Sequence, residues 1–192
     1  LVARLSPVFG GSGEWFWLVG GFGIVTLLWG SISAVRQTDL KGILAFSTVS
    51  HRGMSLCLLA SGSAAFRVDL VTESEFYAKA ILAAIFHLIN HATFKGALFM
   101  AAGIVDHETG TRDIRKLGGL ATIMPLTFTV TMIGTLSMAG LPPFNGFLSK
   151  EMFFTALLQI AELQFFEMQT WGVLFPVIGW IASIFTFVYS LI

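Results

Sequence analysis

Charged residues are scarce in this chain of 192 residues. They make up 11% of it, whereas soluble domains usually carry about 25%. Hydrophobic residues make up 55%, and the mean hydropathy is +0.82. A soluble domain of this length could not bury so much apolar surface, so the composition predicts a membrane protein.

Cysteine is nearly absent, and neither sign of charge is in excess. The single Cys57 excludes an intrachain disulfide and argues against a multi-cysteine metal site. Eleven basic residues balance eleven acidic ones, which leaves no basic patch for nucleic acid. We therefore expect the lipid bilayer, and no nucleic acid, as a partner. The sequence begins with Leu1 and not with Met, it does not open with the pattern of a signal peptide, and it stops at Ile192 inside a hydrophobic run. We therefore expect an internal fragment of a longer polypeptide.

Apolar segments recur along the whole chain and are long enough to cross a bilayer, which takes about 20 residues. They predict one all-α, polytopic transmembrane domain over residues 1–192, with five or six helices. The 147–163 segment is short and follows LPPFNG (141–146). This Pro-Pro sequence makes either a hairpin between two helices or a break within one discontinuous helix. The expected helices are 15–35, 42–62, 80–104, 119–141, 147–163 and 171–192.

Most of the charge falls in three connecting segments. These are RQTDLK (36–41), FRVDLVTESEFYAK (66–79) and DHETGTRDIRKLGG (106–119). Alternating crossings place the first and third on the same side of the membrane, with five basic residues against three on the other side. Because cytoplasmic loops are enriched in Lys and Arg, we expect the first and third segments to face the cytoplasm.

The stretch FHLINHATFKG (86–96) places ionisable residues where a membrane-spanning helix should have none. His87, His91 and Lys95 are four residues apart, so they fall within a sector of roughly 80° on one helix face. Asn90 lies on the adjoining flank of that face. One charge facing lipid at the membrane centre would cost about 3 kcal/mol or more. We therefore expect this stripe to face protein or water.

Three interpretations fit the stripe. A polar seam would hold helices together by hydrogen bonds. A His-x3-His pair can also bind zinc, as an intramembrane metalloenzyme would require, but no Glu follows His87 and Lys95 is a poor ligand. The third interpretation is a proton relay, since histidine titrates near neutral pH and desolvation makes a lysine easier to deprotonate. We favour the relay and expect no bound metal.

Two further lysines stand next to apolar segments. Lys41 precedes the 42–62 helix, where a lysine commonly extends its side chain to the membrane surface. Lys150 follows LPPFNG; it is either an interface residue or part of an ion site at a helix discontinuity.

His51 and Arg52 interrupt another apolar run. His51 lies on the same helix face as Ser47 and Ser55, which gives a hydroxylated polar stripe. Ser47, His51 and Asn90 are therefore secondary candidates for an ion pathway. Arg52 lies well inside the helix and needs an anionic partner or water.

Three motifs stand out along the chain: TDLKGILAFSTVS, FHLINHATFKGALFMAAGIVDHETGTRDIRKLGGL and SMAGLPPFNGFLSKEMFF. Together they resemble one family, the large A subunit of Mrp-type multisubunit Na⁺/H⁺ antiporters, and more distantly the antiporter-like proton-pumping subunits of respiratory complex I. The resemblance covers essentially the whole chain. One departure is SHRG (50–53), where the family usually has an uncharged polar residue followed by an apolar one.

This resemblance implies an inverted-repeat fold with discontinuous helices and a hydrophilic axis that transfers protons through the membrane. The axis glutamate and lysine of the first repeat would lie upstream of Leu1. The implied function is the proton-translocating part of a Na⁺/H⁺ antiporter subunit, which is not an enzyme and needs no cofactor. It would work with other subunits of a hetero-oligomeric complex in the bacterial inner membrane; the alternative is a proton-pumping subunit of a complex I-like oxidoreductase. The axis positions matched here are Lys41, His87, His91, Lys95 and Lys150.

Overall fold

The chain folds into a bundle of long helices, as the apolar segments predict. The computed structural model describes the backbone of residues 1–64, 70–162 and 169–192, and no strand occurs within these ranges. The all-α prediction is therefore confirmed. The helices are α1 (Val2–Phe9), α2 (Gly13–Val35), α3 (Leu40–Ala64), α4 (Leu70–Thr109), α5 (Leu120–Ile123), α6 (Pro125–Ala139), α7 (Asn145–Glu162) and α8 (Gln169–Leu191), with a 3₁₀ turn at Ile114–Lys116.

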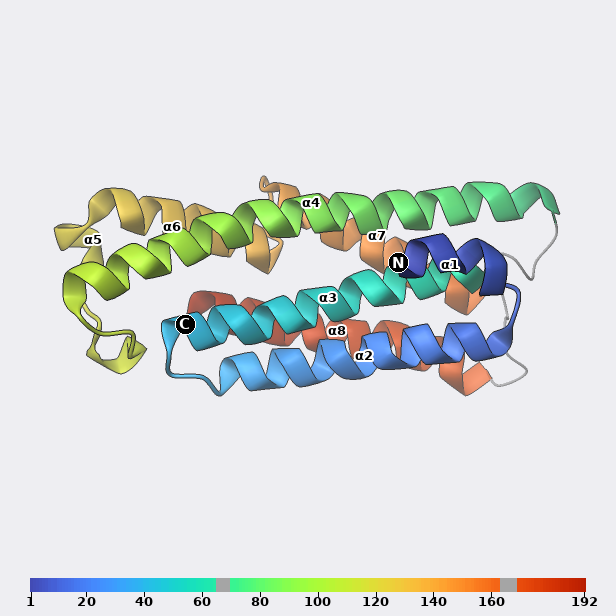
Figure 1. Cartoon of the computed structure of the whole chain (residues 1–192), viewed down its shortest axis with the longest axis horizontal. Helices are drawn as coiled ribbons and strands as arrows, with labels where there is room; N and C mark the ends of the chain where they lie inside the picture. Colours follow the sequence, from blue (N-terminus) through green and yellow to red (C-terminus); the bar gives the residue numbers. More distant parts are fainter. Residues whose placement is uncertain (65–69, 163–168) are drawn as a thin grey trace.

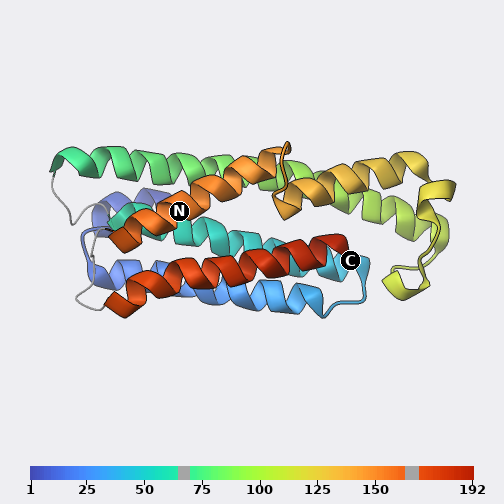
Figure 2. The ribbon, with the colours of Figure 1, turned by 180° about the vertical axis from the view of Figure 1, so that it is seen from behind.

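Four helices of the described chain are long and apolar enough to cross a membrane. They are formed by Gly13–Val35, Leu40–Ala64, Glu75–Thr109 and Leu174–Leu191. The shorter helices α6 and α7 follow one another end to end along α4 (Figures 1 and 2). LPPFNG is therefore a break within one discontinuous helix and not a hairpin.

The break has a steric cause. Pro142 and Pro143 have no N–H to continue the helical hydrogen bonds of α6. Beyond them, the first turn of α7 lies against the last turns of α6. A Cβ on Gly146 would collide with the backbone carbonyl of Ser137, so only glycine fits at this point. The two half-helices consequently meet with their backbones in contact.

The pair α2 and α3 packs just as closely. A Cβ on Gly53 would collide with the backbone of Leu27, and one on Gly30 would lie too close to the backbone of Ser50. Small residues of this kind let transmembrane helices approach until their backbones touch. This contact fixes the register between α2 and α3.

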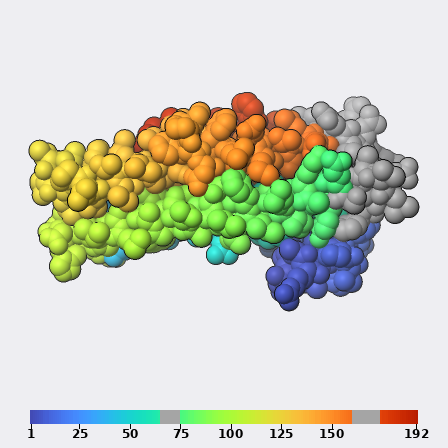
Figure 3. Space-filling view, turned by 90° about the horizontal axis from the view of Figure 1, so that it is seen from above, coloured from blue at the N-terminus to red at the C-terminus, as the bar shows by residue number. Residues whose placement is uncertain are grey.

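The helix α4 runs beside α6 and α7 on one side of the bundle, and α2, α3 and α8 form the other side (Figures 1 and 3). One apolar cluster includes Phe16 and Phe153, and a second includes Leu98 and Tyr189. Polar residues of α3 and α4 lie between the segments that supply these two clusters. Many large apolar side chains, such as Trp29, point outward and are exposed, as expected for a surface that lipid or further protein covers.

The helix α4 is longer than the expected 80–104 segment. Its 40 residues extend about 60 Å at 1.5 Å per residue, roughly twice the thickness of a bilayer core. The segment 66–79, expected as a loop, is helical from residue 70, while residues 65–69 lie outside the described residues. The ends of α4 therefore extend beyond the hydrocarbon layer, and Asp106 sits at one of them.

Candidate functional site

The stripe on α4 is buried inside the bundle. The exposed fractions of His87, His91 and Lys95 are only 2%, 6% and 4%. Helical spacing places the three side chains on one face of α4, and their contacts come from α3 and α7. We refer to these three residues together with His51 and Lys150 as the buried column.

Lys95 contacts only neutral groups. Its ammonium donates hydrogen bonds to the backbone carbonyl of Leu44, at 3.0 Å, and to the hydroxyl of Ser47. Both acceptors belong to α3. No carboxylate forms an ion pair with Lys95 among the residues that the structure describes. Its charge is thus solvated by dipoles and is not neutralised by a counter-ion.

His87 connects α4 to two other helices. Its Nδ1 lies 2.7 Å from the hydroxyl of Ser149 on α7, and its Nε2 lies 3.3 Å from Nδ1 of His51 on α3. The ring of His51 also packs against those of His87 and His91, with ring centroids 5.3 Å and 5.2 Å apart. From the sequence, His51 was only a secondary candidate for the ion pathway. The structure places it in direct contact with His87 and His91.

Lys150 lies at the helix break, only 9% exposed. Its ammonium donates a 2.6 Å hydrogen bond to the carbonyl of Ala139, the last residue of α6. The last carbonyls of a helix have no partner within the helix, so they are natural acceptors for a cation. Lys150 is therefore a buried residue at a discontinuity and not a residue of the membrane interface.

Asn90 holds the break against α4. The amide of Asn145 donates to Oδ1 of Asn90 at 2.9 Å, and the amide of Asn90 donates to the carbonyl of Asn145 at 3.3 Å. The hydroxyl of Ser137 also donates to Oδ1 of Asn145, at 2.7 Å. Sequence reasoning missed Ser137, Asn145 and Ser149. The available signal was a set of polar residues flanking the Pro-Pro break.

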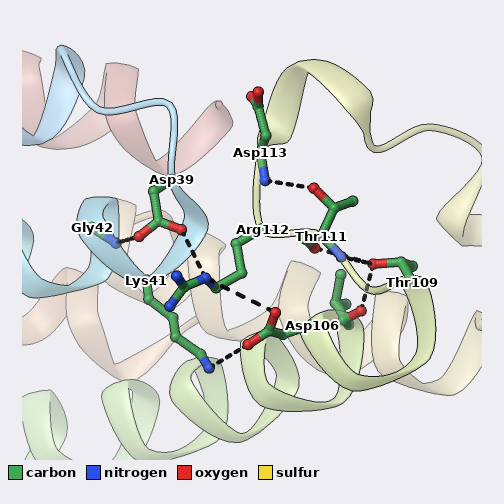
Figure 4. Close-up of polar contacts among 9 residues, drawn as sticks. Asp39, Lys41, Gly42, Asp106, Thr109, Thr111, Arg112 and Asp113 are labelled. Carbon is green, nitrogen blue, oxygen red and sulfur yellow. Dashed lines mark hydrogen bonds and ion pairs between the residues drawn. The ribbon is translucent and has the colours of Figure 1, made fainter.

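Lys41 lies apart from the buried column, at the end of the bundle (Figure 4). Its ammonium forms a 2.7 Å ion pair with Asp106, and the two side chains are 36% and 31% exposed. Arg112 lies 3.5 Å from Asp39 and 3.9 Å from Asp106, measured from Nε to the carboxylate oxygens. We call these four residues, Asp39, Lys41, Asp106 and Arg112, the charged end cluster.

Backbone hydrogen bonds join the two loops that carry this cluster. Asp39 and Asp113 form an isolated antiparallel bridge. Within it, the amide of Leu40 donates to Arg112 and that of Ile114 donates to Thr38, each at 3.0 Å. The two segments expected on one side of the membrane therefore lie at the same end of the bundle.

Arg52 lies on the outer surface of α3. Its side chain is exposed, and it forms no ion pair with any residue that the structure describes. Its neighbour His51 points into the bundle, because adjacent residues on a helix face directions about 100° apart.

Residues 1–176 match the family described as the transmembrane region of NADH:quinone oxidoreductase and Mrp antiporters. The chain belongs to this family. It is also 70% identical over 192 residues to the A subunit of the Na⁺/H⁺ antiporter of Alkalihalophilus pseudofirmus, and 62% identical over 191 residues to that of Bacillus subtilis. The predicted resemblance is thereby confirmed. The match covers 100% of the chain but only 24% of either relative, so the chain spans about a quarter of their length.

A solved structure agrees with these sequence relatives. The Mrp complex from a Dietzia species matches 99% of this chain with a TM-score of 0.82 and 35% sequence identity, and the match covers 19% of the Dietzia chain. The family, the bacterial relatives and the apolar helices together make this a multi-pass bacterial membrane protein. They also place the helix break in an antiporter-like fold.

Proposed function

We propose that this chain is the proton-translocating part of a Na⁺/H⁺ antiporter subunit, and that protons move along the buried column. The observation that carries the proposal is a run of buried titratable side chains from three helices, whose hydrogen-bond partners are neutral groups. The names of the relatives support Na⁺ and H⁺ as the exchanged ions and other antiporter subunits as partners.

The surroundings of Lys95 suit a group that gains and loses a proton. A carboxylate partner would stabilise the ammonium form and hold the proton. The carbonyl of Leu44 and the hydroxyl of Ser47 stabilise it less, and the hydroxyl can also donate to a neutral amine. Lys95 can therefore change charge without leaving an unpaired buried ion behind.

The histidines supply groups with two proton-binding nitrogens each. An imidazole can accept a proton on one nitrogen and release one from the other. His87 already has a neighbour on both sides, Ser149 and His51. Lys41 stands at the exposed end of the same helices, where we propose that it exchanges protons with the aqueous phase.

Substitution of Lys95 in the complete antiporter tests this function. Lys95→Ala and Lys95→Arg should both abolish Na⁺-driven proton exchange in membrane vesicles while the complex still assembles. Arginine keeps the positive charge but does not release its proton. Lys79, on the same helix but exposed and paired with Glu75, is the matched control, and Lys79→Arg should exchange normally. Normal exchange by an assembled Lys95→Arg complex would contradict the relay.

The family description also includes NADH:quinone oxidoreductase, so the second candidate is a proton-pumping subunit of such an oxidoreductase. The two functions separate in a vesicle assay without a redox substrate. An antiporter supports proton exchange driven by a Na⁺ gradient alone, whereas a redox pump requires quinone reduction. The metalloenzyme interpretation gains no support, since no group of three or more metal-ligating side chains occurs among the described residues.

A further inference from the structure

His51 and Lys150 both line a small cavity inside the bundle. Its volume is ≈ 10 Å³, and its walls come from α2, α3, α7 and α8. The polar residues around it are His51, Lys150, Ser50, Ser183 and Thr186. Three of these four helices, α3, α7 and α8, therefore contribute side chains able to form a hydrogen bond.

His51 presents an unpaired nitrogen in this region. Its Nδ1 is occupied by His87, at 3.3 Å. Its Nε2 is buried and has no hydrogen-bond partner within the described part of the chain. A buried polar atom left in this way is costly, and in proteins such atoms are usually satisfied by a side chain or an ordered water. His91 has an unpaired Nε2 as well, but His91 does not line this cavity.

Lys150, which lines the cavity from α7, has hydrogen-bond donors to spare. A lysine ammonium has three N–H donors, and the carbonyl of Ala139 takes one of them. Ser50 and Thr186 add hydroxyls to the lining, and Ser50 donates to the carbonyl of Leu27 at 3.1 Å. A small molecule in the cavity would therefore have both hydrogen-bond donors and hydrogen-bond acceptors within the lining.

The small volume of the cavity limits which molecule can bind in it. A space of this volume holds about one water molecule, which needs two to four polar partners to bind stably. We propose that a single water molecule binds here, donating a hydrogen bond to Nε2 of His51 and accepting one from Nζ of Lys150. His51 is then a positioning residue that links His87, through this water, to the lysine at the helix break.

The packing of His51 supports this role. Its ring lies between those of His87, His91 and Phe94, with centroids 5.2 to 5.5 Å away. These contacts hold the imidazole in one orientation, with one nitrogen on His87 and the other available to the water. The inference rests on the proposed function, because the link matters only where protons move between the histidines and Lys150.

The first test is a density map of the complete antiporter complex at a resolution that shows ordered water. We expect a peak within hydrogen-bonding distance of His51 Nε2 and Lys150 Nζ. A map that shows other buried waters but none here would overturn the proposal. So would a map in which a protein group bonds directly to Nε2.

The second test compares His51→Phe with His51→Gln in Na⁺-driven proton exchange. Phenylalanine keeps the ring packing but cannot hold the water, so exchange should fall about tenfold with assembly unchanged. Glutamine keeps a donor and an acceptor, so it should restore exchange to at least about half. The exposed His107 at the end of α4 gives the control, and His107→Phe should exchange normally.

The remaining outcomes are equally decisive. Normal exchange by His51→Phe, or equal loss in both His51 variants, contradicts the positioning role. If Lys95→Ala also exchanges normally, the proposed function itself fails. If Lys95→Ala is inactive and His51→Phe is normal, only the water link is wrong.

Discussion

Lys95 and Lys41 each join α3 to α4, yet their surroundings differ. Lys95 is 4% exposed and bonds only to a carbonyl and a hydroxyl. The Lys41 side chain is 36% exposed and pairs with a carboxylate. A counter-ion favours the charged form of a lysine more strongly than neutral acceptors do. The comparison therefore separates a buried lysine with neutral partners from a lysine at the surface that is paired with a carboxylate but remains accessible to water.

The largest effect on exchange should come from giving Lys95 in the buried column a carboxylate partner, as Lys41 has in the charged end cluster. Ser47→Asp places a carboxylate beside Lys95 and should reduce Na⁺-driven exchange about a hundredfold, because the ion pair holds the lysine charged. Ser47→Ala is the control; it removes one hydrogen bond and should reduce exchange less. An assembled Ser47→Asp complex with normal exchange would show that Lys95 works equally well beside a counter-ion.

Loss of the amide contact at the helix break should have the next largest effect. Asn145→Leu removes the bonds to Asn90 and Ser137 and should destabilise the folded complex by about 2 kcal/mol, since buried partners lose their hydrogen bonds. Thermal unfolding of the purified complex measures this. Asn145→Asp retains the acceptor for Ser137 and should lose less stability than the leucine variant. Equal stability of the leucine variant and the native complex would contradict the assignment.

Loss of the main ion pair in the end cluster should cost less. Asp106→Asn removes the carboxylate that faces Lys41 and Arg112. Partly exposed ion pairs contribute about 0 to 1 kcal/mol, and salt weakens them further. The variant should therefore melt slightly earlier at low ionic strength and converge with the native complex at high salt. A large loss at both salt concentrations would show that the cluster is more than a surface ion pair.

The smallest effect concerns Asp113, beside the cluster. The hydrogen bond from Arg115 lowers the pKa of the Asp113 carboxyl to about 2. A lowered pKa stabilises the fold above the ordinary carboxyl pKa, and this contribution disappears as pH falls toward 2. Arg115→Ala should raise the pKa of Asp113 toward its ordinary value without changing exchange. Titration of Asp113 by NMR in labelled protein checks this, and an unchanged pKa would contradict it.

The sequence predicted those features that depend on local periodicity. Apolar segments give the helices, and four-residue spacing places His87, His91 and Lys95 on one face. It could not distinguish a break from a hairpin at LPPFNG, since the answer lies in the contact between Gly146 and Ser137. That contact is tertiary and leaves no periodic signal.

Partners distant in the sequence were equally hidden. Asp106 is 65 residues from Lys41, and neither composition nor spacing connects them. Ser149 stands directly before Lys150, but a lone serine in a helix is too common to indicate a contact. His51 was placed on the correct polar face, but its contact with His87 depends on how α3 packs against α4.

The glycine contacts between α2 and α3 have a mechanical consequence. Because the backbones touch at Gly30 and Gly53, these two helices cannot slide past each other and behave as one stiff wall. Ser47 and His51 belong to α3 and therefore to this rigid pair. His87 and Lys95 belong to α4, and Lys150 belongs to α7. Displacement of these side chains relative to one another would therefore fall at the contacts of α3 with α4 and α7, which are made by side chains, and not at the backbone contact between α2 and α3.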